Sequence, residues 1–299
     1  MTPRRQSARN AGILLLLAGT LVVALADASA KWLTASYPTS QIIFVRATTG
    51  LVLVTLFIAL FGKFSDLRSR RMHWHGVRAG LITVTMLGVY YALAHIPMVE
   101  VEAIGHAAPF FVGLLSPWFV RERVTGHNWL AIAIGFIGIL IILRPDPERF
   151  HIAHVYMFFC ALSYALLILI ARRISDTEGV LAINFYIYPL TVAVTGFIAS
   201  NVWVPPSPAD WGMFLLQGLF ATAATLLFIA GVRHVEAALA ATLDYSTLIW
   251  VSIIGFTVWG ESPDALTAVG ILLIVASGIY VVRHSTRQID ESIVQTSEH

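Results

Sequence analysis

Polar residues interrupt the apolar runs of this sequence at a spacing that could build a binding surface. Glu102, His106 and Pro109 follow one another at intervals of four and three residues, which places them on one face of a helix. A shift of 139 residues leads to a second stripe around Tyr245, with Asp244 beside it. Such groups on an apolar wall are typical of a pocket for a polar organic molecule with an apolar body. His106 and Tyr245 could equally bond or pack between helices, and Pro109 is expected to loosen its helix.

Two further apolar runs contribute hydroxyl groups that could face the same space. Thr83 and Tyr90 share one face of the run at 76–95, and Thr222 lies in the run at 210–232. The predicted substrate-binding residues are therefore Glu102, His106, Pro109, Tyr90, Tyr245, Asp244, Thr83 and Thr222.

Asp27, Lys31 and Arg46 form a separate charged group. Asp27 and Lys31 are four residues apart with the acid first, the favourable order for an ion pair on a helix. Arg46 lies at a similar depth in the next apolar run. We predict that the three residues clamp these two helices together. The alternative is that they bind an anionic substrate group or gate the outer mouth of a transport path.

Membrane-spanning helices are the elements that must position these residues. The chain of 299 residues is 58% hydrophobic and 12% charged, with a mean hydropathy of +0.78, whereas a soluble domain carries about 25% charged residues. A spanning helix needs about 17 to 25 mostly apolar residues. The apolar runs fall at 12–33, 40–61, 76–95, 98–119, 128–144, 153–171, 178–202, 210–232, 236–259 and 265–282. We therefore predict an all-α integral membrane protein with ten transmembrane helices.

The first run has a second interpretation, because residues 1–30 resemble a secretory signal with basic residues at the start. The run continues into Asp27 and Lys31 without a polar break, which favours a retained helix; a chain of nine spans is the alternative. Most of the 19 Lys and Arg residues lie in loops on the side of the N-terminus. The positive-inside rule then predicts a multi-pass protein of a bacterial inner membrane, with both termini in the cytoplasm.

The same shift of 139 residues superimposes the five apolar runs of one half on those of the other. We predict a first repeat at 1–144, a second at 145–283 and a cytoplasmic polar tail at 284–299. Because each repeat has an odd number of helices, the second must enter the membrane from the opposite face. Inverted-topology repeats are typical of secondary transporters.

Several stretches resemble the drug/metabolite transporter superfamily in its EamA-type branch. They are Asp27-Ala28-Ser29-Ala30-Lys31-Trp32, then Tyr90-Tyr91-Ala92-Leu93-Ala94-His95-Ile96-Pro97, and Gly260-Glu261 near the end of the ninth run. In the first repeat Arg121 precedes Glu122, where the family usually has glycine. The resemblance implies ten helices, a central cavity lined largely by helices 3, 4, 8 and 9, and transport driven by gradients rather than ATP.

Motifs for other chemistry are missing from the sequence. It has no phosphate-binding G-x-x-x-x-G-K-[ST] loop, and Cys160 is its single cysteine. We therefore predict no enzyme activity, no cofactor and no metal. A membrane-embedded enzyme acting on lipid-linked groups is the alternative from another class, but it would need a catalytic dyad or a paired acidic motif.

The prediction is a secondary carrier of a small organic metabolite. A planar vitamin such as riboflavin is the first candidate substrate, and an amino acid or a metabolite of the S-adenosylmethionine type, imported or exported, is the second. A proton is a candidate coupling ion, because His106, Glu102 and Asp244 can bind and release protons. The expected partners are the substrate and the lipid bilayer, with no nucleic acid and with the protein as a monomer or homodimer.

Overall fold

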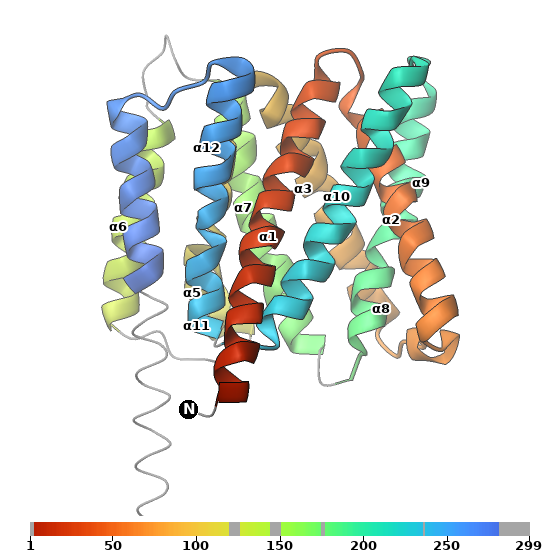
Figure 1. Ribbon diagram of the computed structural model, residues 1–299, viewed down its shortest axis with the longest axis horizontal. Coiled ribbons are helices and arrows are strands. Elements are labelled where there is room, and N and C mark those ends of the chain that lie inside the picture. Colours follow the sequence, from red (N-terminus) through yellow and green to blue (C-terminus); the bar gives the residue numbers. More distant parts are fainter. Residues whose placement is uncertain (1–2, 120–125, 144–150, 175–176, 236, 281–299) are drawn as a thin grey trace, which may run out of the picture.

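The computed structural model describes residues 3–119, 126–143, 151–174, 177–235 and 237–280. Within these residues the regular structure is helical, without strands (Figure 1). The elements are α1 (Pro3–Thr34), α2 (Thr39–Phe61), the 3-10 helix η1 (Phe64–Leu67), α3 (Met72–His95), α4 (Met98–Gly105), α5 (Ala108–Phe119), α6 (Gly126–Leu143), α7 (Ile152–Ile174), α8 (Val180–Phe185), α9 (Ile187–Ser200), α10 (Pro208–Val232), α11 (Ala237–Asp244) and α12 (Ser246–Trp259). A C-terminal helix, Ala265–Tyr280, follows. Glu122 and the tail at 284–299 lie outside the described residues.

The predicted membrane architecture is confirmed. Eight helical spans in the described residues are long and apolar enough to cross a membrane, and shorter apolar helices lie at Ala133–Ile142 and Ala265–Tyr280. These ten segments coincide with the ten apolar runs of the sequence. The surface exposes large apolar side chains, including Phe197 at 75% and Trp118 at 71%. Such a surface suits lipid as the solvent rather than water.

Three of the spans are broken into two helices, which the run lengths alone did not predict. The span at 98–119 breaks between α4 and α5, where Pro109 follows the gap. Proline has no N–H to pair with the carbonyl of Gly105, four residues earlier, yet it fits the first turn of a new helix. The expected loosening by Pro109 is thus confirmed as a full interruption.

The span at 237–259 breaks at Tyr245 without a proline. There the backbone N–H of Leu248 donates to the carbonyl of Tyr245 at 3.2 Å. The hydroxyl of Thr247 donates to the carbonyl of Asp244 at 2.8 Å. These two bonds satisfy carbonyl groups that a helix end leaves without intrahelical partners. The third break, between α8 and α9, falls at Tyr186.

The two halves of the chain run in opposite directions. We call the end of the bundle where α1 begins the lower end and the end where α1 finishes the upper end, as they appear in Figure 1. The span of α4 and α5 descends from the upper end, whereas the span of α11 and α12 rises from the lower end. His106 and Tyr245 mark the two breaks and are 139 residues apart, the offset of the repeat. This arrangement is that of two inverted five-helix repeats.

Close packing holds the helices in this arrangement. α1 lies along α10, and α3 lies along α7. α6 crosses the C-terminal helix at two glycines, where a Cβ added to Gly138 would lie 2.8 Å from the carbonyl oxygen of Gly270. Small residues at such crossings allow helix backbones to approach in a membrane, where van der Waals packing contributes much of the attraction.

Candidate functional site

The two matching helix breaks meet in the interior of the bundle. The rings of His106 and Tyr245 lie with their centroids 5.2 Å apart and their planes at 35°. His106 Nε2 lies 3.7 Å from Asp244 Oδ2. The structure therefore brings together three of the predicted residues, which come from the two stripes 139 residues apart.

The orientation of His106 leaves one ring nitrogen open. Nδ1 lies 2.8 Å from the carbonyl oxygen of Glu102 and must carry the proton, because a carbonyl only accepts. In the neutral ring Nε2 then bears the lone pair. This atom is buried and has no hydrogen-bond partner among the described residues, while the Asp244 side chain is 48% exposed. His106 Nε2 can accept from a bound molecule, or donate to Asp244 once protonated.

A pair of carboxyl groups adjoins His106. The carboxyl groups of Asp27 and Glu102 lie close enough to interact electrostatically, and Glu102 also interacts with Asp244. Glu102 Oε2 also lies 3.6 Å from His106 Nδ1. Asp27, Glu102, His106, Asp244 and Tyr245 thus form one group, which we call the central polar cluster.

Arg46 lies beside this cluster and contacts α3. Its guanidinium interacts electrostatically with Asp27 and lies 5.7 Å from the ring centroid of Tyr90. The hydroxyl of Tyr90 accepts a hydrogen bond from Gln217 Nε2 on α10. Tyr90 is buried, so its ring packs beside Arg46 inside the bundle.

Among the described residues, Lys31 pairs with Glu261 instead of Asp27, which corrects the predicted ion pair. Lys31 Nζ lies 2.5 Å from Glu261 Oε1 and donates to the carbonyl of Ile96 at 3.0 Å. Glu261 Oε2 accepts from the backbone N–H of Met98 at 3.0 Å. The ion pair therefore joins α1, the α3–α4 turn and the end of α12. Asp27 interacts instead with Glu102 of α4 and with Arg46 of α2.

Glu261 was not among the predicted site residues, although the Gly260-Glu261 dipeptide was a visible signal. Gly260 ends α12 with a φ of 69°, a left-handed conformation that glycine adopts without strain. The N–H of Gly260 then donates to the carbonyl of Phe256, the bond of an αL cap, and that of Glu261 donates to the carbonyl of Gly255. This cap turns the Glu261 side chain towards Lys31.

The remaining predicted residues are distributed elsewhere. Thr83 is buried and its hydroxyl bonds to that of Thr191 at 2.9 Å, so it joins α3 to α9. Pro109 is exposed just after the break. Thr222 lines a separate cavity between the helices.

This cavity has a volume of about 350 Å³ and is formed by α2, α3, α7, α8, α9 and α10. We call it the lower cavity, because Arg78 and Asn184 on its wall belong to helix segments near the lower end. Of the predicted residues, Arg46 and Thr222 line it. Tyr164 on its wall also interacts electrostatically with Asp244 and Glu102, so the cavity adjoins the central polar cluster. In the sequence, Arg78 is only one of the basic residues that the positive-inside rule places on the cytoplasmic side.

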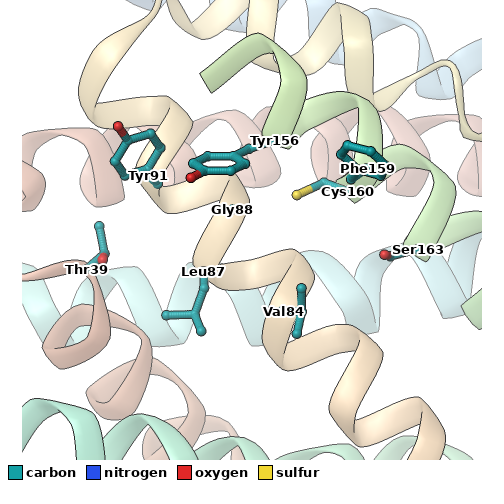
Figure 2. A pocket seen from close by; sticks show the side chains of 9 residues that line it. All are labelled: Thr39, Val84, Leu87, Gly88, Tyr91, Tyr156, Phe159, Cys160 and Ser163. Atoms are coloured by element: carbon teal, nitrogen blue, oxygen red, sulfur yellow. The ribbon is translucent and has the colours of Figure 1, made fainter. Parts of the chain in front are cut away.

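A second hollow, of about 380 Å³, lies between α3 and α7 near the start of α2 (Figure 2). Its walls are mostly apolar and aromatic, and Val84 and Phe159 are 62% and 56% exposed. Its floor is tight, since a Cβ on Gly88 would overlap Cys160 Sγ. This lateral groove carries no charged residue. The lower cavity with the central polar cluster is therefore the better candidate site.

Comparisons with known proteins match both halves of the chain. A sequence model described as the EamA-like transporter family matches residues 10–144 and 151–283. An S-adenosylmethionine uptake transporter of Rickettsia bellii is 23% identical over 89% of this chain and 91% of its own. The pseudopaline exporter of Pseudomonas aeruginosa strain UCBPP-PA14 is 26% identical, covering 92% and 96%. A riboflavin transporter of Vibrio cholerae is 22% identical, covering 93% and 94%.

The fold also occurs in a solved structure. A crystal structure of another protein aligns with a TM-score of 0.62 and 18% identity, covering 95% of this chain and 99% of that chain. This likeness concerns the fold alone.

Proposed function

Because the chain belongs to the EamA-like transporter family, we propose that it carries a small organic metabolite across the membrane by a gradient-driven mechanism. One observation supports the position of the site. Two helices broken at equivalent places in the repeat bring His106, Asp244 and Tyr245 together beside a cavity. Secondary transporters commonly build their substrate sites from such discontinuous helices near the middle of the membrane.

The charge of the central polar cluster bears on the substrate. Asp27, Glu102 and Asp244 contribute three carboxyl groups, and Glu102 interacts electrostatically with the other two. Such a site favours a molecule with a positive charge. S-adenosylmethionine is such a molecule, because its sulfonium group is cationic. We therefore propose a substrate of the S-adenosylmethionine type ahead of a neutral vitamin such as riboflavin. The phenol rings of Tyr164 and Tyr245 would suit the planar rings of either compound.

The proposed transport cycle uses the two ends of the bundle in turn. The ion pair of Lys31 and Glu261 closes the upper end, while the lower cavity reaches towards the lower end. We propose that the lower end faces the cytoplasm, as the distribution of basic residues suggests. A membrane-impermeant reagent on intact cells distinguishes the two orientations, since only the upper end would then be within its reach. The adjoining carboxyl groups of Asp27 and Glu102 make this pair a candidate for proton coupling.

The test is uptake of radiolabelled S-adenosylmethionine and riboflavin into proteoliposomes that contain the purified protein. We expect His106→Ala and Tyr245→Ala each to lower uptake about tenfold or more, which corresponds to about 1.4 kcal/mol of lost stabilisation. The amount of inserted protein should not change. His95→Ala and Tyr156→Ala serve as matched controls, because both residues lie away from the central polar cluster and Tyr156 lines the lateral groove. Normal uptake in the first two variants, with loss in Tyr156→Ala, would place the site in the groove instead.

A further inference from the structure

Two arginines share the wall of the lower cavity. Arg46 comes from α2 and lies deep in the bundle, beside Asp27. Arg78 comes from α3 near the lower end and is 8% exposed. The described residues that line the cavity include no aspartate or glutamate. The cavity is therefore basic, although it adjoins an acidic cluster.

Neither guanidinium has a carboxylate within ion-pair distance in the described part of the chain. Arg78 Nη1 donates to the carbonyl of Ile183 at 2.6 Å, and Arg78 Nε is buried without a partner. Asp27 interacts electrostatically with Arg46, but it also interacts with Glu102. A buried charge without a counter-ion costs several kcal/mol. Arg78 is such a charge, and Arg46, which is half-buried beside Asp27, faces the same space, so an anion from outside the chain would complete the site.

The other walls of the cavity indicate the chemical character of the rest of that ligand. Ile82, Met86 and Leu167 supply apolar surface, and Tyr164 supplies an aromatic ring. Tyr164 also interacts electrostatically with the carboxyl groups of Glu102 and Asp244. A molecule in this space would thus meet basic groups, an apolar wall and acidic groups in succession.

We propose that Arg46 and Arg78 form an anion-binding subsite for a carboxylate or phosphate group of the transported molecule. The inference rests on the proposed transport function and narrows the substrate to molecules that carry both an anionic group and a cationic or polar one. Guanidinium groups suit this role because their planar donors match the two oxygens of a carboxylate or phosphate. Arg78 lies nearer the lower end, so the anionic group would meet Arg78 first and Arg46 deeper in the cavity.

The first experiment measures how fast phenylglyoxal, an arginine reagent, modifies each arginine of the purified protein, with mass spectrometry as the readout. Two probe pairs differ only in an anionic group: S-adenosylmethionine against its decarboxylated analogue, and flavin mononucleotide against riboflavin. We expect the carboxylate or phosphate member of at least one pair to slow modification of Arg46 and Arg78, and the member without the anionic group to leave the rate unchanged. Protection by the carboxylate alone or by the phosphate alone identifies which anion the site takes. Arg173 is the internal control, since it is exposed and lies over the Trp74 ring instead of in the cavity.

The second experiment compares binding of the same pairs to variants. Arg78→Gln should weaken binding of the anionic member about 10- to 100-fold, the range for a lost charge-assisted hydrogen bond. It should change binding of the counterpart less than about twofold. Arg78→Lys should recover part of the loss, and Arg173→Gln should change neither. Equal loss for both members would mean that Arg78 acts only by holding Ile183, and would overturn the subsite.

The outcomes also separate the subsite from the proposed function. If a probe is transported but no probe alters the modification rates of Arg46 and Arg78, the subsite is overturned and the carrier function stands. Protection of both arginines by a probe that is not transported would support the subsite and reject that probe as substrate.

Discussion

The upper and lower ends of the bundle differ in how the two repeats meet. At the upper end Lys31 of the first repeat pairs with Glu261 of the second, and both bond to the turn between α3 and α4. At the lower end His75 and Glu178 also join the two halves, at 3.2 Å, but they leave the lower cavity beside them. The lower end thus has a cavity with charged walls beside its polar contact, whereas the described lining of the lateral groove near the upper end is uncharged. The difference matters because a carrier must expose its site to one side at a time.

The largest expected effect follows from removing the charge of Glu261. Glu261→Gln weakens the ion pair with Lys31, a charge-assisted bond worth about 1.5 to 3 kcal/mol. Val99 is 4% exposed and lies in the first turn of α4, next to this contact. In a Cys160→Ser background we expect Val99→Cys to react about tenfold faster with a membrane-impermeant maleimide when Glu261→Gln is added. Intact cells are the sample, so the label also reports which end faces outside.

Asp264→Asn is the control for this prediction. It removes the same charge three residues further along, where Asp264 Oδ1 accepts from the backbone N–H of Thr267, and the asparagine retains an oxygen for that bond. An unchanged labelling rate in Glu261→Gln would show that the ion pair does not hold the upper end closed.

The contact at the lower end is expected to affect stability, with a dependence on pH. Burial raises the pKa of Glu178, but hydrogen bonds from Ser69, His75 and the Arg70 amide outweigh it and place this pKa below its ordinary value of 4.5. A carboxyl whose pKa falls on folding stabilises the fold above its unfolded pKa, and this contribution is lost as pH falls through the folded pKa. Glu178→Gln should therefore lower the melting temperature at pH 7, and the difference from the wild-type protein should shrink below pH 4.5. A difference that does not depend on pH would contradict this account.

The smallest expected effect concerns a second polar contact at the upper end. Glu100 Oε2 lies 2.9 Å from His154 Nε2 and joins α4 to α7. In Glu100→Gln the side-chain amide can still donate to His154, so the charge is lost but the hydrogen bond survives. We expect labelling of Val99→Cys to change less than about threefold, within the range of a net hydrogen bond. A change as large as that of Glu261→Gln would mean that the upper end is held by its total charge rather than by Lys31 and Glu261.

The positions of the helices were predictable because they depend on local hydropathy. A span must bury its backbone groups within about 20 consecutive apolar residues, so the run at 40–61 becomes α2, Thr39–Phe61, and the run at 210–232 becomes α10, Pro208–Val232. The break near Pro109 was also visible, since proline removes a helical hydrogen bond whatever surrounds it. The break at Tyr245 had no such signal, because no residue there forbids a helix.

The pairing of charges in the site is what only the tertiary structure decided. In the sequence Asp27 is the obvious partner of Lys31, one helical turn away. In the folded chain Lys31 meets Glu261, far along the sequence, and Asp27 meets Glu102. An ion pair on one helix is worth only about 0.2 to 0.5 kcal/mol, so packing between helices easily overrides it. Arg78 shows the same limit: sequence identifies a basic residue near a helix end, but only the packing of several helices places it on a cavity wall.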